Sequence, residues 1–144
     1  MFKRFKRTVK NIIISDFSSL EISAGFGIGI FIGFLPFYGF QTVLSVLAAI
    51  LIKKVNKIAL IFATQLFLPF VIPVVLALNF LTGSLILYHK VAIFRITNMS
   101  DVLFYFKPIL LGSIPNGLLF GFISVFVLYR IINFIRRKKN VTEK

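Results

Sequence analysis

Three long apolar runs constrain this chain more than any other feature. Residues 22–52 and 58–88 contain no charged residue, and residues 109–134 contain only Arg130. Uncharged apolar runs longer than about 18 residues are typical of membrane segments. The sequence therefore predicts an all-α integral membrane protein, with a single membrane domain over residues 20–135.

The net charge of +13 would suggest nucleic-acid binding in a soluble chain. Here the cations bracket the apolar runs, at residues 53–57, at 136–139 and at the N-terminus, where they are Lys3, Arg4, Lys6, Arg7 and Lys10. Cations so placed are the usual positive-inside flanks, and each attracts anionic headgroups by about 1 kcal/mol. The expected partners are therefore anionic membrane lipids, and no nucleic acid.

The N-terminal segment, residues 1–18, has apolar side chains spaced three to four apart, with the cations between them. They are Phe2, Phe5, Val9, Ile12, Ile13 and Phe17. This spacing predicts a basic amphipathic helix lying in the headgroup layer. A disordered basic tail is the alternative, and the segment is too interrupted for a cleavable signal peptide.

The tetrapeptide Phe-Leu-Pro-Phe occurs at residues 34–37 and again at 67–70. As one helix, the first run would be about 46 Å long, whereas the hydrocarbon core is about 30 Å thick. Pro36 removes a backbone donor and disfavours helix at the residue before it. With Gly33 and Gly39 on either side, it divides the run into two half-length helices. They predict a re-entrant hairpin.

Charge placement favours the same hairpin. If the first run enters and leaves on one face, all three basic clusters are cytoplasmic, as the positive-inside rule requires. This predicts a multi-pass protein of the bacterial plasma (inner) membrane with both termini cytoplasmic, the tail 136–144 included, and with residues 89–107 outside. A second hairpin at Pro69 and Pro73 is the alternative, and it would move the last crossing to the other face.

Proline also interrupts the other two runs. The second run, residues 58–88, should break at Pro69 and Pro73. The third, residues 109–134, should break at Pro115, because Pro-Asn-Gly is a turn-type tripeptide. The remaining residues up to 134 suffice for a tilted span, and Arg130 can extend to the interface.

Small residues recur at helical spacing in two places. Gly25, Gly29 and Gly33 form one stripe, and Gly117 with Gly121 forms another. Such stripes allow helices to approach closely in lipid. They predict close helix packing, within one chain or across a homo-oligomer.

Catalytic chemistry is poorly represented. The apolar runs contain no ionisable side chain of Asp, Glu, His or Lys, and the chain has no cysteine. His89, at a membrane boundary, is better explained as an interfacial residue than as a base. We therefore expect no enzyme, no catalytic residue, no metal site and no cofactor.

The polar residues near the first break form the candidate ligand site, which comprises Pro36, Tyr38, Gly39, Gln41 and Thr42. Gln41 and Thr42 suit either of two roles: bonding to a ligand, or satisfying the carbonyls that the break leaves free. Exposed N–H groups at the start of the following half-helix would favour an anion such as a phosphate headgroup.

One pattern combines these features: Gly25-x3-Gly29-x3-Gly33-x2-Pro36-x2-Gly39-x-Gln41-Thr42, then a basic turn with Asn56, then Pro69-x3-Pro73 and Gly83. Over residues 20–88 it resembles a family of small bacterial membrane proteins classified as domain of unknown function 2062. Where that family typically has Asn-Pro followed by Thr, this chain has Leu68-Pro69 and Val71.

The resemblance implies an inner-membrane protein, and the attachment of this domain to a glycosyltransferase in some relatives suggests work on polyprenyl-phosphate-linked glycans or envelope lipids. Two hypotheses follow. The chain handles or translocates an anionic lipid or polyprenyl-phosphate carrier, or it is a non-transporting accessory subunit of a partner membrane enzyme.

Overall fold

The computed structural model describes residues 17–66, 71–89 and 99–142. They contain α2 (Ser19–Phe34), α3 (Gln41–Leu51), α4 (Lys57–Thr64), α5 (Ile72–Tyr88) and α6 (Met99–Thr142). The expected all-α fold is confirmed for this part of the chain, which contains no strand. Within α6, Tyr105–Lys138 is long and apolar enough to cross a membrane, and α2, α3 and α5 are shorter apolar helices.

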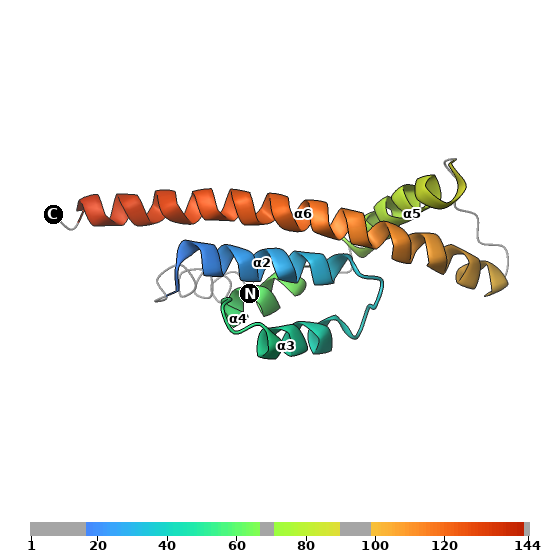
Figure 1. Cartoon of the computed structure of the whole chain (residues 1–144), viewed down its shortest axis with the longest axis horizontal. Coiled ribbons are helices and arrows are strands. Elements are labelled where there is room, and N and C mark those ends of the chain that lie inside the picture. Colours follow the sequence, from blue (N-terminus) through green and yellow to red (C-terminus); the bar gives the residue numbers. More distant parts are fainter. Residues whose placement is uncertain (1–16, 67–70, 90–98, 143–144) are drawn as a thin grey trace.

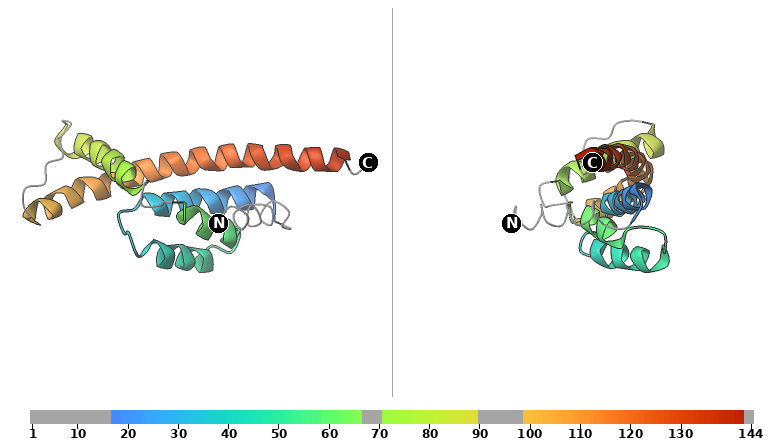
Figure 2. Two further views of the ribbon diagram at one scale, coloured as in Figure 1. Left: turned by 180° about the vertical axis from the view of Figure 1, so that it is seen from behind. Right: turned by 90° about the vertical axis from the view of Figure 1, so that its left-hand side faces the viewer.

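The long helix α6 runs along the whole molecule, and the other helices pack beside it (Figure 1). Its C-terminal half lies antiparallel to α2, and its N-terminal half crosses α5. On the other side of α2 comes α4, and α3 is outermost, as the reverse view also shows (Figure 2). The start of α2 and the end of α6 therefore lie at the same end of the molecule.

A capping box begins α2. The Ser18 hydroxyl accepts from the Glu21 N–H at 3.2 Å, and the Glu21 carboxylate accepts from the Ser18 N–H at 2.8 Å. It also accepts from the Ser18 hydroxyl at 2.8 Å. The two bonds donated by Ser18, the backbone bond foremost, lower the pKa of Glu21 below its ordinary value. The box stabilises this helix start in the charged form of Glu21.

This coupling predicts an acid-sensitive contribution to stability. A carboxyl group with a lowered pKa stabilises the fold above its unfolded-state pKa, and the contribution is lost as the pH falls through the lower, folded-state value. Thermal unfolding followed by circular dichroism should show a loss of stability as the pH falls below 4.5, the ordinary value for this carboxyl. In Glu21→Gln, which keeps a capping side chain, that loss should be smaller. Equal losses in both proteins would contradict it.

The first run is divided at Pro36. α2 ends at Phe34, Leu35 is extended at φ −67° and ψ 137°, and α3 begins only at Gln41. An extended residue before proline is what the proline ring imposes. Gly39 has a φ of 95°, a left-handed conformation that glycine adopts without a Cβ clash.

The second run is interrupted between α4 and α5. Asn56 caps α4 by accepting from the Ala59 N–H at 2.8 Å, and α4 ends after eight residues at Thr64. Pro73 lies in the first turn of α5, where its missing N–H costs no helical bond. Pro69 is outside the described residues.

The predicted break at Pro115 is wrong. α6 continues through both Pro108 and Pro115, and it begins ten residues before the third apolar run. The ribbon bends where it passes α5, which relieves the clash of a proline ring with the preceding turn (Figure 1). Flanking helices support a bent helix that the Pro-Asn-Gly tripeptide alone would not favour, and residues 99–107 are helical rather than an open loop.

The glycine stripes pack against helices of the same chain. A Cβ on Gly25 would lie 2.5 Å from the Asn56 carbonyl oxygen, and one on Gly29 would lie 2.6 Å from the Ala63 Cβ. A Cβ on Gly117 would lie 2.9 Å from the Phe31 ring. α2 therefore presents glycine to α4, while α6 presents glycine to α2. Gly33 is also buried in α2.

Candidate functional site

The residues predicted to bind a ligand lie between the end of α2 and the first turn of α3, but two of them bond within the protein. The Gln41 amide donates to the Gly33 carbonyl at 3.2 Å. The Thr42 hydroxyl accepts from the Gln65 amide at 3.1 Å, which ties α3 to the end of α4. Gln41 thus satisfies a carbonyl at the end of α2, which is the structural alternative of the two roles.

The other three residues at this break differ in their surroundings. Pro36 is half-buried, and Gly39 is exposed. The hydroxyl oxygen of Tyr38 is buried and has no hydrogen-bond partner in the described part of the chain. Because this oxygen is buried, it is not open to a ligand at the surface.

Sequence reasoning missed a buried polar cluster where α2, α5 and α6 meet. The Asn79 amide donates to the Phe34 carbonyl at 2.8 Å and accepts from the Asn116 amide at 3.1 Å. The Thr82 hydroxyl donates to the Asn116 oxygen at 3.1 Å. Asn79 is the only asparagine in the second apolar run, which was the available signal. Since the amides bond one another, the cluster serves the architecture.

Two cationic segments meet beside the start of α2, at the opposite end of the molecule from the break at Pro36. The Asn56 N–H, beside Lys53, Lys54 and Lys57, donates to the Glu21 carbonyl at 3.0 Å. Arg136 donates to the Phe17 carbonyl at 2.8 Å. The loop after α3, the start of α2 and the end of α6 are therefore neighbours. The predicted headgroup-binding cations Lys3, Arg4, Lys6, Arg7 and Lys10 are outside the described residues.

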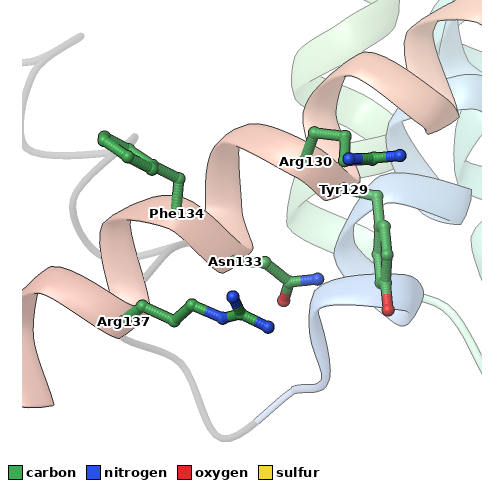
Figure 3. Close-up of a pocket in the computed structure, with 5 residues that line it drawn as sticks. All are labelled: Tyr129, Arg130, Asn133, Phe134 and Arg137. Atoms are coloured by element: carbon green, nitrogen blue, oxygen red, sulfur yellow. The ribbon is translucent and has the colours of Figure 1, made fainter.

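A pocket of about 370 Å³ lies at this end, lined by Tyr129, Arg130, Asn133, Phe134 and Arg137 of α6. Figure 3 shows the polar ends of Asn133 and Arg137 close to one another and Phe134 pointing away. The Arg130 guanidinium lies 5.1 Å from the centre of the Phe126 ring, a cation–π contact that orients it. Guanidinium forks and an amide are donors that suit a phosphate. We call this the basic pocket.

An apolar groove of about 310 Å³ lies further along α6, where it packs against α2. Its lining is Ala24, Gly27, Ile28 and Phe31 of α2 with Gly117, Leu118, Gly121, Phe122 and Val125 of α6. We call it the α2–α6 groove. Val125, at its end, precedes Tyr129 of the basic pocket by one helical turn. An apolar concavity therefore adjoins a cationic one.

No group of three or more His, Cys, Asp or Glu that could hold a metal occurs in the part of the chain that the structure describes. The donors assembled here are thus guanidinium, amide and hydroxyl groups. They can bind and orient an anion.

Comparison with known proteins gives one result. The family model described as "Uncharacterized protein conserved in bacteria (DUF2062)" matches residues 2–140, nearly the whole chain. No curated protein and no solved structure matches the chain.

Proposed function

The chain belongs to the DUF2062 family, and we propose that it is an integral protein of the bacterial plasma membrane that binds and handles an anionic lipid, a phospholipid or a polyprenyl phosphate. The carrying observation is the basic pocket, which lies near the start of α2, where the cationic loop after α3 and the cationic end of α6 come together. This function is a binding role at the cytoplasmic face.

Exposed apolar side chains support a membrane location. On α3 alone, Val43, Val46, Leu47, Ile50 and Leu51 are between 42% and 71% exposed. Only 11% of the most apolar stretch of Tyr105–Lys138 is buried inside the protein, whereas the core helix of a soluble protein is mostly buried. Soluble monomers rarely expose apolar surfaces of this extent.

The convergence of cations supports the topology with both termini inside. Residues 53–57 and 136–139 lie beside the start of α2, as expected if α2 and α3 enter and leave on one face. Arg130 and Arg137 would then lie at headgroup depth. The α2–α3 pair would be the re-entrant hairpin, and α6 a crossing.

A binding experiment tests the pocket. Arg130→Gln with Arg137→Gln should weaken retention of phosphatidylglycerol by tenfold or more in nanodiscs made mainly of phosphatidylcholine, because each cation contributes about 1 kcal/mol and about 1.4 kcal/mol is tenfold. Native mass spectrometry of lipid released with the protein measures it.

Lys53→Gln with Lys54→Gln is the matched control, since both lysines are exposed at the same end of the molecule and outside the pocket. It removes the same charge and should weaken retention less. If the two double variants weakened retention equally, general electrostatic attraction would explain the binding and the basic pocket would not be the site. No preference of the parent protein for an anionic lipid over phosphatidylcholine, tested with phosphatidylglycerol and with hexadecyl phosphate, would overturn the proposal.

A second candidate is a non-transporting accessory subunit of a membrane enzyme in envelope glycan or lipid synthesis. It is favoured by the internal bonding of Gln41, Thr42, Asn79 and Asn116, which uses these polar side chains within the protein rather than for a ligand. Accelerated transbilayer movement of labelled phosphatidylglycerol in reconstituted vesicles would exclude a non-transporting subunit. Absence of acceleration together with unselective lipid retention in the nanodisc experiment would favour the subunit.

A further inference from the structure

Building on the proposed function, we propose that the lipid is a single-chain lipid phosphate, a phosphate ester of one long hydrocarbon chain. Its phosphate binds in the basic pocket, and its chain lies in the α2–α6 groove. Polyprenyl phosphates and long alkyl phosphates have this chemistry, whereas a diacyl phospholipid does not.

The groove and the pocket lie along one stripe of α6. Leu118, Phe122, Val125, Tyr129 and Asn133 follow one another at spacings of four, three, four and four residues. Such spacing keeps side chains on one helix face. From Leu118 to Asn133 the stripe rises about 22 Å at 1.5 Å per residue. A single extended chain can therefore follow it from the middle of α6 to the cationic end.

Glycine gives the groove its depth. A Cβ on Gly27 would overlap the Val125 side chain and would lie 2.9 Å from the Gly121 carbonyl oxygen. A Cβ on Gly121 would in turn lie 3.1 Å from the Gly27 carbonyl oxygen. α2 and α6 thus touch backbone to backbone, and the larger side chains stand as walls on either side. Phe122, which lines the groove from α6, is 72% exposed, so the groove opens outward.

The size and polarity of this path favour one chain. About 310 Å³ is at the lower end of the range of roughly 300–1,000 Å³ for ligand pockets. Among the residues that line the two sites, Tyr129 is the one polar group between Val125 and the basic end. The two ester groups of a diacyl lipid would lie at this level largely unbonded, which is unfavourable in an apolar setting. A phosphate attached directly to the chain avoids this.

Charge separates this path from an ordinary lipid-facing surface. An apolar groove alone would bind the tail of any lipid. The α2–α6 groove, however, leads to Arg130 and Arg137, whose guanidinium groups select an anion. The match of an apolar groove with a cationic end identifies the occupant as amphiphilic and anionic.

A competition experiment in detergent tests whether the hydrocarbon chain of the lipid binds in the α2–α6 groove. Parent protein should bind hexadecyl phosphate at least about tenfold more tightly than dipalmitoyl phosphatidic acid and than hexadecyl phosphocholine. Leu118→Trp, which fills the groove, should lose the preference for hexadecyl phosphate over phosphatidic acid. Leu119→Trp, at the neighbouring and similarly exposed position outside the groove, should keep it. Displacement of a fluorescent alkyl phosphate measures all three ligands.

Phe122→Trp and Ile123→Trp form a second matched pair, one in the groove and one outside it. Equal behaviour within both pairs, or equal binding of the one-chain and two-chain phosphates by the parent, would overturn binding of the hydrocarbon chain in the groove and leave the headgroup proposal standing. If instead the parent bound hexadecyl phosphocholine as tightly as hexadecyl phosphate, the basic pocket itself would be refuted, and both proposals with it.

Discussion

Gly83→Ala should destabilise the protein by about 3 kcal/mol, although one methyl group is all that it adds. A Cβ on Gly83 would overlap the carbonyl oxygen of Pro108 and would lie 2.5 Å from its carbonyl carbon and 2.9 Å from its Cα. These are backbone atoms of α6, so no side-chain rotation can make room. The sign of the change in the free energy of unfolding reports on this contact, because Gly→Ala inside an unpacked helix is stabilising by up to about 1 kcal/mol.

The measurement is unfolding of the detergent-solubilised protein in a denaturant titration followed by circular dichroism. Gly121→Ala is the matched control in α6, since the nearest atom to its Cβ is the Gly27 carbonyl oxygen at 3.1 Å and the next lies at 3.8 Å. It should change the free energy of unfolding by less than about 1 kcal/mol. A similar loss in the two variants would show that α5 and α6 are not locked at this crossing.

The same crossing explains which parts of the fold local sequence signals could predict. The division at Pro36 follows from the proline ring and from the residue before it, so it is visible within a few residues. The contact of Gly83 with Pro108 joins positions 25 residues apart, and the contact of Gly112 with Asn79 joins positions 33 apart. The spacing of these residues along the chain does not indicate that they are in contact.

Pro115 shows that a local sequence signal can also predict a break that the fold does not contain. Pro-Asn-Gly is a turn signal where water can bond the freed backbone groups. In α6 the tripeptide lies between the crossing with α5 and the seam with α2, and Asn116 bonds to Asn79 instead of initiating a turn. Tertiary packing therefore overrides the local preference. A proline is tolerated in a helix that its neighbours support.

The candidate site was only partly visible in the sequence. A role for Gln41 in satisfying a carbonyl was one of its two expected roles, and the bond to Gly33 fits it. The sequence predicts that Arg130 reaches the interface, but its grouping with Asn133 and Arg137 on one side of α6 requires the helix to continue past residue 134. The expected end of the third run at residue 134 concealed the pocket.

Asn79→Leu should cost about 2–4 kcal/mol, the second large effect that we expect. The Asn79 side chain is fully buried and makes two interhelical bonds, to the Phe34 carbonyl at 2.8 Å and from the Asn116 amide at 3.1 Å. Leucine has a similar size but neither bonding group. The substitution therefore removes the donor that bonds to the Phe34 carbonyl and the acceptor that bonds to the Asn116 amide. A buried polar group that loses its partner costs about 1–3 kcal/mol.

Thr82→Val is the control, because it removes only the bond from the Thr82 hydroxyl to Asn116 and leaves the bond between the two asparagines. Single interhelical hydrogen bonds in membrane proteins average about 0.6 kcal/mol, so this variant should lose that much. The same denaturant titration compares the two. If Asn79→Leu were as mild as Thr82→Val, the junction of α2, α5 and α6 would be held by glycine packing alone. A large difference would show that the amide pair fixes where α2 ends against the bend of α6, and hence the seam on which the α2–α6 groove depends.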